Sequence, residues 1–334
     1  MNYGMTFMNP LVSILIPCYN AEKFIADAIR SCLNQTYENI EIIVVDDGST
    51  DNSFAVAKQF ESSKIKVVRQ ANAGACRARN HAFELSRGDL IQFFDADDLL
   101  SPDKIQAQVK AYLETGDPRS VITCPWQKFI SQPGDCSQEK HKCFKSFASG
   151  DELLLTLLDG YGVEVFLLHC YLTPRDVVKA SGSWDEKIKL NQDGEFFARV
   201  LLHAGQIIYV PDVISYYRCS ENNTISRTLS REKIASAFYA LQQIEKNLLA
   251  TKDSQRVREI LAYALTLNAC FSCNYCLKTA MMAVEEIRKI GMTPQLYGDG
   301  ITVKIARIIG LKNALRIKAL CLILNKALNK IGRK

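Results

Sequence analysis

Three aspartates, Asp95, Asp97 and Asp98, directly follow an apolar run in the segment LIQFFDADDLL at residues 90–100. The Ile and Phe residues before them are typical of a buried strand, where a charge is costly to desolvate. Closely spaced carboxylates at a strand end suit a hard divalent cation, and Mg²⁺ usually takes one or two protein carboxylates together with phosphate oxygens. We therefore expect a metal ion and a diphosphate here. The alternative is that Asp98 and Asp103 cap or flank the next helix.

A second acidic cluster, DDGSTD, occupies residues 46–51 at the end of another apolar run. Gly48 permits a tight turn after Asp46 and Asp47. A carboxylate at this place can accept hydrogen bonds from a ribose or a base edge, as acidic residues do in nucleotide sites. The same residues can also form a turn and a helix N-cap, and the two interpretations are compatible.

Two arginines, Arg77 and Arg79, stand in NAGACRARN at residues 72–80, at the start of a predicted helix. Arginine suits phosphate because its planar side chain donates hydrogen bonds in pairs. The chain contains neither a GxxxxGK(S/T) nor a GxGxxG pattern, the two common phosphate loops. We expect a nucleotide that is held without either loop.

A third group of polar side chains lies in SWDEKIKLNQDGEFFARV at residues 183–200, beside Trp184. Asp193 precedes an amphipathic helix in this segment. One interpretation is a general base that faces the metal site. The other is a carboxylate that stabilises the helix dipole.

The elements that must position these residues follow from hydrophobic periodicity. Between residues 12 and 124 short apolar runs alternate with amphipathic stretches, the pattern of βαβ units and a parallel sheet. Ligands of open α/β sheets bind outside the carboxyl ends of the strands, so we expect the polar clusters at one edge. The predicted strands are 12–17, 40–47, 65–70, 89–97 and 120–125, and the predicted helices are 22–35, 50–61, 74–86 and 102–114.

The second half of the chain is expected to differ in organisation. Residues 126–150 are polar and poorly periodic, which predicts a loop or an excursion from the domain. A further αβ section follows, and the pattern after residue 230 is helical to the end. Its predicted helices are near 150–159, 174–180 and 192–204, and its predicted strands are near 164–172, 206–211 and 214–218.

Composition narrows the class of protein. A net charge of +5 over 334 residues is too modest to indicate nucleic-acid binding. The N-terminal segment lacks the basic and apolar regions of a secretory signal, and no run of 18 uncharged apolar residues occurs, so we expect a cytoplasmic location. The 12 cysteines are then expected to be reduced. Cys270, Cys273 and Cys276 lie in an apolar helix-like run, which favours packing over metal ligation.

The runs at residues 12–51 and 72–98, from VSILIPCYN to VVDDGSTD and from NAGACRARN to FFDADD, resemble the family 2 glycosyltransferases. The resemblance extends over about residues 11–220. It implies an α/β GT-A fold, with a Rossmann-like, mostly parallel sheet flanked by helices. We expect an extension at 1–10, a GT-A domain at 11–225 with a nucleotide-sugar half (11–125) and an acceptor half (150–225), and a C-terminal helical region at 230–334.

The resemblance also implies an activity. A family 2 enzyme moves a sugar, of the hexosyl or N-acetylhexosaminyl type, from a nucleotide-diphosphosugar to a hydroxyl group with inversion, using Mg²⁺ or Mn²⁺. We expect a UDP or dTDP donor. The expected acceptor is a glycan or lipid-linked saccharide in the biosynthesis of bacterial lipopolysaccharide, capsule or exopolysaccharide.

The residues that match the family's motifs receive its roles. On the donor side, the resemblance implies a base pocket, a ribose contact, a DXD metal site at Asp97 with Asp95, and a diphosphate contact. On the acceptor side it implies that Trp184 and Asp185 lie near the acceptor and that Asp193 is the catalytic base. The donor-binding residues would be Pro17 and Tyr19 in the base pocket, Asp47 holding the base, Arg79, Asp95 at the ribose and Arg218 at the diphosphate.

One position departs from the family pattern. Where the family has a Glu-Asp pair, this chain has Gln192 and Asp193. Losing the negative neighbour would lower the pKa of the proposed base relative to the family pattern. Gln192 is also the one feature that favours a non-catalytic sugar-nucleotide binding or scaffold protein. A nucleotidyltransferase is a second alternative, but that class needs a glycine-rich basic loop after the first strand, and PCYNAEKF has only Lys23.

The C-terminal segment 301–334 contains nine Lys and Arg residues and no Asp or Glu. On a helix most of these basic residues fall on one half and the apolar residues on the other. This composition predicts a peripheral helix at the anionic inner face of the cell membrane. The alternative is a helix packed on the catalytic domain with a solvated basic face.

Overall fold

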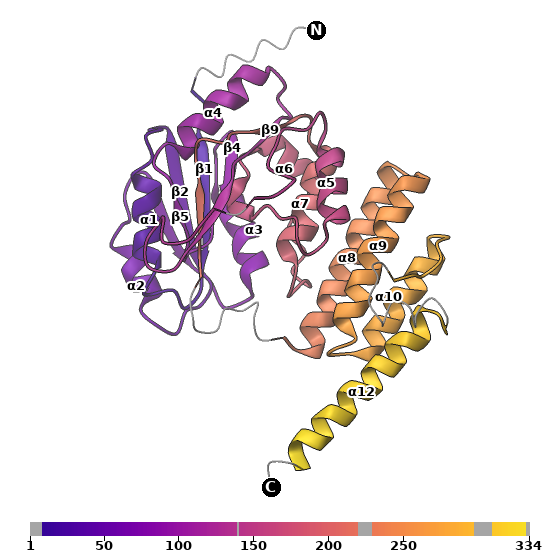
Figure 1. Ribbon diagram of the computed structural model, residues 1–334. Coiled ribbons are helices and arrows are strands. Elements are labelled where there is room, and N and C mark those ends of the chain that lie inside the picture. The colour runs from indigo at the N-terminus through magenta and orange to yellow at the C-terminus, as the bar shows by residue number, and fades with distance from the viewer. Residues whose placement is uncertain (1–8, 139, 220–228, 297–308, 332–334) are drawn as a thin grey trace. The chain divides into compact units, whose positions relative to one another are not determined.

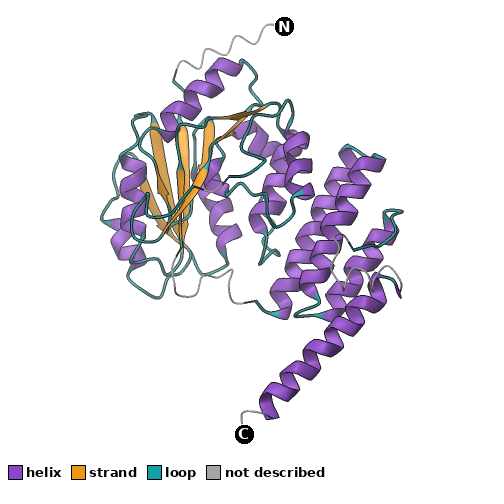
Figure 2. Ribbon diagram, in the orientation of Figure 1, coloured by secondary structure: helices purple, strands orange, loops and turns teal. Residues whose placement is uncertain are grey.

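A computed structural model describes residues 9–138, 140–219, 229–296 and 309–331, with side chains up to residue 321 in the last range. The chain forms two compact units. The first combines residues up to 156 with 164–186 and 192–222, and the second combines 157–163 and 187–191 with the chain from 223 onward. Figure 1 traces the chain, and Figure 2 shows a sheet between helices in the first unit and helices in the second.

The main sheet has the strand order β3-β2-β1-β4-β8. Its first four members are parallel, and β8 pairs antiparallel to β4. Every residue of β1 and β2 is buried, as expected for parallel strands that are covered on both faces. The strands are β1 (Val12–Cys18), β2 (Ile40–Asp46), β3 (Ile65–Arg69), β4 (Leu90–Phe93) and β8 (Thr173–Pro174).

Four helices alternate with these strands, which confirms the predicted βαβ pattern. One core gathers side chains from β1, β2 and α1, among them Ile14, Val44 and Ile29, each fully buried. Burial of a side chain of this size contributes about 1.5–3 kcal/mol relative to leaving it exposed. The helices are α1 (Ile25–Leu33), α2 (Ser53–Lys58), α3 (Ala75–Leu85) and α4 (Lys104–Thr115).

Two small sheets complete the first unit. One has the order β5-β10-β7 and the other pairs β6 with β9. The segment 120–125, predicted in the parallel sheet, forms β6 instead, because β8 takes the place next to β4. These strands are β5 (Leu99–Leu100), β6 (Val121–Thr123), β7 (Trp126–Phe129), β9 (Ile207–Tyr209) and β10 (Ser215–Arg218).

Three further predictions need correction. The fourth strand ends at Phe93, so the acidic cluster lies in the turn after it. The predicted loop 126–150 begins with the strand β7. The predicted strand 164–172 is wrong: this apolar segment contains the short 3-10 helix η1 (Leu168–Cys170). The residues that pair with β4 are Thr173 and Pro174, which follow the segment.

The remaining helices of this half are α5 (Gly150–Asp159), α6 (Arg175–Ser181) and α7 (Gln192–His203). Helix α7 is anchored by Phe196 and Phe197. The Phe196 ring stacks on Trp184 with centroids 4.0 Å apart, and the Phe197 ring stacks on Tyr171 at 4.1 Å. This packing fixes the N-terminal turn of α7, which carries Asp193.

The second unit contains the helices α8 (Arg231–Thr251), α9 (Gln255–Ser272), α10 (Leu277–Lys289) and α12 (Leu311–Ile331). Ser230 and Ser254 cap α8 and α9 by accepting hydrogen bonds from the N–H groups of Lys233 and Val257. In the described part of the chain, no helix is both long and apolar enough to cross a bilayer. Residues 301–308 and 332–334 of the predicted basic helix lie outside the described residues.

Candidate active site

The loops after β1 and β2 are joined to each other. The N–H of Asn20 donates to Ser49 Oγ at 3.0 Å, and the N–H of Thr50 donates to Asn20 Oδ1 at 2.9 Å. Asn20 has a φ of 49°, a left-handed conformation that Asn tolerates. Pro17 lies buried in β1, whereas the neighbouring Tyr19 is 45% exposed beyond the strand end. Of these two predicted base-pocket residues, Tyr19 presents its side chain to the surface.

Asp47 organises the loop that leads into α3. One of its oxygens accepts from Gln70 Nε2 at 2.8 Å and from the N–H of Ala73 at 2.9 Å, and the other accepts from the N–H of Gly74 at 2.8 Å. A carboxylate offers about four lone-pair sites, so these three bonds leave about one for a ligand. Gly48 is required beside it, because its φ is 71° and a Cβ would lie 2.8 Å from Asn72 N.

The turn at residues 95–98 is held by Arg218 of β10. The Arg218 side chain donates from Nε to the carbonyl oxygen of Asp97 at 2.7 Å, and the Arg218 backbone N–H donates to Asp98 Oδ1 at 2.8 Å. The guanidinium carbon lies 4.4 Å from the centre of the Phe129 ring. Asp98 therefore fastens the turn to β10 and does not cap α4, which begins at Lys104. Asp103, the other residue of the predicted helix-cap alternative, is the N-cap residue of α4, although its side chain accepts no capping hydrogen bond.

Asp98 also contacts His169, to which the sequence assigned no role. His169 Nδ1 lies 3.4 Å from Asp98 Oδ2, and both side chains are 1% exposed. Burial, with a contribution from Lys104, lowers the pKa of His169 to about 3, and burial raises the pKa of Asp98. Both shifts disfavour charge on the two side chains, which meet inside the protein.

Asp95 and Asp97 are the two partly exposed carboxylates of this turn. The Asp95 side chain is 32% exposed. Desolvation and the nearby charge of Asp95 raise the pKa of Asp97 to about 6. A bound divalent cation would relieve both effects, and carboxylate oxygens are the ligands that Mg²⁺ and Mn²⁺ prefer. The donor set therefore fits the metal ion that the sequence predicts.

Arg79 links the two acidic centres. Its side chain is 6% exposed, Nη2 donates to Asp95 Oδ1 at 2.9 Å, and Nη1 lies 3.7 Å from Asp193 Oδ1. Nη1 also donates to Gln192 Oε1 at 3.1 Å. The neutral Gln192 thus keeps a hydrogen bond to Arg79 where the family has an acid. Because Gln192 is neutral, the acidic side chains that pair with the positive charge of Arg79 are Asp95 and Asp193.

Asp193 lies in the first turn of α7 with its side chain 42% exposed. Desolvation raises the pKa of this carboxyl group to about 6; Arg79 opposes the increase and Asp95 adds to it. The group therefore combines an accessible oxygen with a pKa near neutral, as a general base requires.

The Trp184 ring packs against the guanidinium group of Arg79. It is 3% exposed, and the Arg79 guanidinium carbon lies 4.6 Å from its ring centre. The Asn80 side chain holds the backbone of Trp184 in place. It donates to the carbonyl oxygen of Trp184 at 3.0 Å and accepts from the Trp184 N–H at 2.8 Å. Asp185 follows with a partly exposed side chain. The sequence alone assigned Asn80 no role. Its position next to Arg79 on α3 is the signal that could have indicated a place in the site.

Two protein sequences illustrate the similarity to known proteins. An uncharacterized glycosyltransferase of Haemophilus influenzae is 42% identical over 108 residues, which cover 31% of this chain and 43% of that protein. The putative teichuronic acid biosynthesis glycosyltransferase TuaG of Bacillus subtilis is 40% identical over 113 residues, which cover 33% of this chain and 45% of that protein. The aligned segment thus spans less than half of either relative.

Two solved structures share the fold. TarS residues 1–349 of S. aureus, in complex with UDP, has a TM-score of 0.65 at 17% identity, over 91% of this chain and 89% of that one. Mannosyltransferase PcManGT from Pyrobaculum calidifontis, in complex with GDP-Man and Mn²⁺, has a TM-score of 0.55 at 18% identity, over 94% of this chain and 87% of that one. The predicted GT-A fold is confirmed.

The sequence profile of Glycosyl transferase family 2 matches residues 13–180, which is half of the 334-residue chain. The matched range includes the joined loops, the acidic turn and Arg79. The chain belongs to glycosyltransferase family 2.

Proposed function

We propose that the protein is an inverting glycosyltransferase that uses a nucleotide-diphosphosugar and a hydroxyl acceptor. The observation that carries this proposal is the position of Arg79 between two acidic centres, 2.9 Å from Asp95 and 3.7 Å from Asp193. The centre at Asp95 suits a metal-bound diphosphate, and the centre at Asp193 suits a general base. The transfer of a sugar away from a diphosphate to a hydroxyl group needs both, side by side.

On the donor side, Asp97 and Asp95 would hold Mg²⁺ or Mn²⁺, which neutralises charge on the leaving diphosphate. Asp95 would also contact the ribose. Arg79 orients Asp95, and Arg218 fixes the turn next to the diphosphate. Pro17, Tyr19 and Asp47 would form the base pocket, with Asp47 acting through its remaining lone pair and through the loop at residues 70–74 that it holds.

On the acceptor side, Asp193 would take the proton from the acceptor hydroxyl group. The hydroxyl oxygen forms a bond to the anomeric carbon while the bond from that carbon to the diphosphate oxygen breaks, and the single displacement inverts the centre. Asp185 would contact the acceptor. Trp184 would contribute by packing beneath Arg79, since its ring is buried.

The donor is proposed to be of the UDP or dTDP type, and the sugar a hexose or N-acetylhexosamine. Residues 11–125 would form the nucleotide-sugar half and 150–225 the acceptor half of the domain. The proposed acceptor is a glycan or lipid-linked saccharide of a bacterial surface polysaccharide. The similarity to TuaG, which is named for teichuronic acid biosynthesis, supports this class.

A cytoplasmic protein with such an acceptor would work at the inner face of the membrane, and α12 supports this location. Leu311 and Leu315 are buried, whereas Ile317 and Leu320 on the same helix are 48% and 60% exposed. Arg316 is exposed beside them. Exposed apolar side chains next to an exposed basic one on the same helix suit an anionic lipid surface.

The test is a panel of UDP-, dTDP- and GDP-sugars, first by thermal shift with and without Mn²⁺ and then by release of the nucleotide diphosphate. We expect Asp193→Asn to retain donor binding and lose turnover. Asp176→Asn is the control, since Asp176 is 86% exposed on α6. Full turnover by Asp193→Asn would contradict the base, and donor binding without transfer or hydrolysis by the native protein would favour a binding protein.

A further inference from the structure

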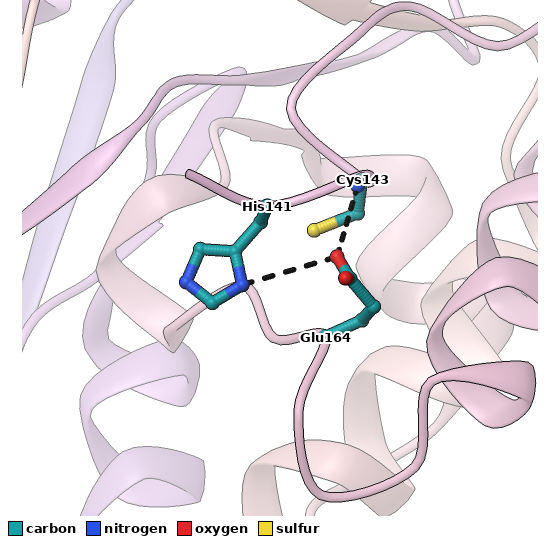
Figure 3. A group of neighbouring side chains, drawn as sticks. All are labelled: His141, Cys143 and Glu164. Carbon is teal, nitrogen blue, oxygen red and sulfur yellow. Dashed lines mark hydrogen bonds and ion pairs between the residues drawn. The ribbon is translucent and has the colours of Figure 1, made fainter. Parts of the chain in front are cut away.

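We propose that His141, Cys143 and Glu164 form a binding site for a transition-metal ion of the zinc type, outside the donor site. Each residue offers one ligand atom, and the three atoms lie within 4.8 Å of one another. Figure 3 shows the three side chains pointing toward one another. In the described residues, this is the one cluster of three or more His, Cys, Asp or Glu residues close enough to hold an ion.

Two separate segments of the first unit bring the ligands together. His141 and Cys143 come from the long connection after β7, and Glu164 comes from the connection after α5. The N–H of Cys143 donates to Glu164 Oε2 at 3.1 Å, which joins the segments directly. The Trp126 indole donates to the carbonyl oxygen of Val165 at 3.0 Å. The backbone around the cluster is therefore positioned before any ion arrives.

The cluster is enclosed by aromatic side chains. The His141 ring centre lies 5.3 Å from that of Trp126 and 4.9 Å from that of Phe144. Cys143 is fully buried, and the side chains of His141 and Glu164 are 7% and 9% exposed. Packing of this kind restricts the ligand rotamers, so little ordering is left for a metal ion to impose.

The chemistry of the three groups selects the class of ion. Zn²⁺ binds imidazole nitrogen, thiolate sulfur and carboxylate oxygen, and three protein ligands leave a fourth position for water. The thiolate and the carboxylate carry two negative charges, which a divalent ion neutralises in this buried place. Mg²⁺ and Ca²⁺ prefer oxygen ligands only. The cluster therefore differs in chemistry from the all-oxygen pair Asp95 and Asp97.

Binding at this site would release a proton. Burial, together with the charge of Glu164, raises the pKa of the Cys143 thiol to about 12. Sγ thus carries its proton in the metal-free protein and loses it to solvent when the metal–sulfur bond forms. A bound ion would tie the connection after β7 to the segment that begins at Glu164, within the first unit, and so act as a structural clip. It takes no part in the proposed sugar transfer.

The experiment uses the full-length protein after treatment with a chelator, titrated with Co²⁺ and then with Zn²⁺. We expect one tightly bound Co²⁺ per chain, a thiolate-to-cobalt charge-transfer band, and loss of the band when Zn²⁺ displaces Co²⁺. Cys143→Ser should lose the band, and the isosteric Glu164→Gln should bind at least about tenfold more weakly. Zn²⁺ should raise the melting temperature of the native protein and not that of Cys143→Ser.

Two controls separate this site from others. Cys136→Ser, in the same connection but outside the cluster, should keep the band. Asp97→Asn should keep it as well, which distinguishes the cluster from the donor site. A native protein that folds without showing a thiolate band would overturn the proposal. So would a band that persists in Cys143→Ser, since another cysteine would then be the ligand.

Discussion

The guanidinium group of Arg79 donates to Asp95 Oδ1 at 2.9 Å, and its other terminal nitrogen lies 3.7 Å from Asp193. One buried cation therefore holds a proposed donor contact in position and opposes the effect of desolvation on the pKa of the proposed base. Because a positive neighbour favours the ionised form of a carboxyl group, the pKa of Asp193 depends on Arg79.

The first prediction concerns pH. The base must be deprotonated, so kcat/KM of the native enzyme should rise with pH through about 6, the pKa of Asp193. Arg79→Met removes the partner that lowers this pKa, so the rise should move to higher pH. Loss of a charged hydrogen bond should also lower kcat/KM by about tenfold to a hundredfold.

The measurement is a pH profile of kcat/KM for Arg79→Met and for Arg30→Met. Arg30 is an exposed control on α1 that pairs with Asp27. An identical apparent pKa in the native enzyme and Arg79→Met would contradict the electrostatic link.

A second prediction concerns the turn after β2. Gly48→Ala combines a left-handed φ with a Cβ 2.8 Å from the backbone nitrogen of Asn72, so something must move. We expect a loss of about 1–3 kcal/mol in the free energy of unfolding and weaker donor binding. Gly116→Ala is a matched control, with a φ of 66° and no atom within 4 Å of the added Cβ. Denaturant unfolding should show the larger loss for Gly48→Ala; equal losses would mean that the contact with Asn72 does not matter.

A third prediction concerns Glu245 in α8. Its side chain is buried, and desolvation and the charge of Glu286 raise its pKa to about 7. Between about pH 4.5 and 7 the native state therefore holds a proton that the unfolded state has lost, and stability should fall as pH rises through this window.

Glu245→Gln should flatten that fall and raise the melting temperature above pH 7. The control is Glu259→Gln, an exposed residue of α9. Melting curves from pH 4 to 9 measure the effect, and an unchanged slope in Glu245→Gln would show that another group titrates.

A fourth prediction concerns the open face of α12. Removing the whole helix would also remove the buried Leu311 and Leu315 and expose the side chains that they cover, so point substitutions are the cleaner test. The double change Ile317→Ser and Leu320→Ser should reduce flotation with anionic vesicles and leave the fold intact. Leu113→Ser, which alters another exposed leucine, should bind as the native protein does. Native flotation by the double variant would refute the membrane role of this face.

The parallel sheet and the acidic clusters at its edge could be predicted because their signals are local. Runs such as VSILIP and IEIIVV carry their own periodicity, and the strand-end rule then places Asp47 and Asp95 on one side. The apolar segment 164–172 has the same local signal but forms a 3-10 turn, because its packing is decided by residues far away in the chain.

The contacts that complete the site have no local signal. Asn80 meets Trp184 across 104 positions, and Asp98 meets Arg218 across 120. The cluster of His141, Cys143 and Glu164 likewise joins two connections that periodicity cannot place. Only the folded chain reveals these pairs, since residue type alone does not specify a distant partner.

The most direct test of the account is calorimetry with the nucleotide that gives the largest thermal shift in the donor panel, in the presence and absence of Mn²⁺. Native protein and the nearby control Asp103→Asn should bind at least about tenfold more tightly with Mn²⁺, because Asp97 would hold the ion that neutralises charge on the diphosphate. Asp97→Asn should lose this gain and bind equally with and without the ion. A Mn²⁺-dependent affinity in Asp97→Asn equal to that of the native protein would contradict the proposed metal site and the mechanism built on it.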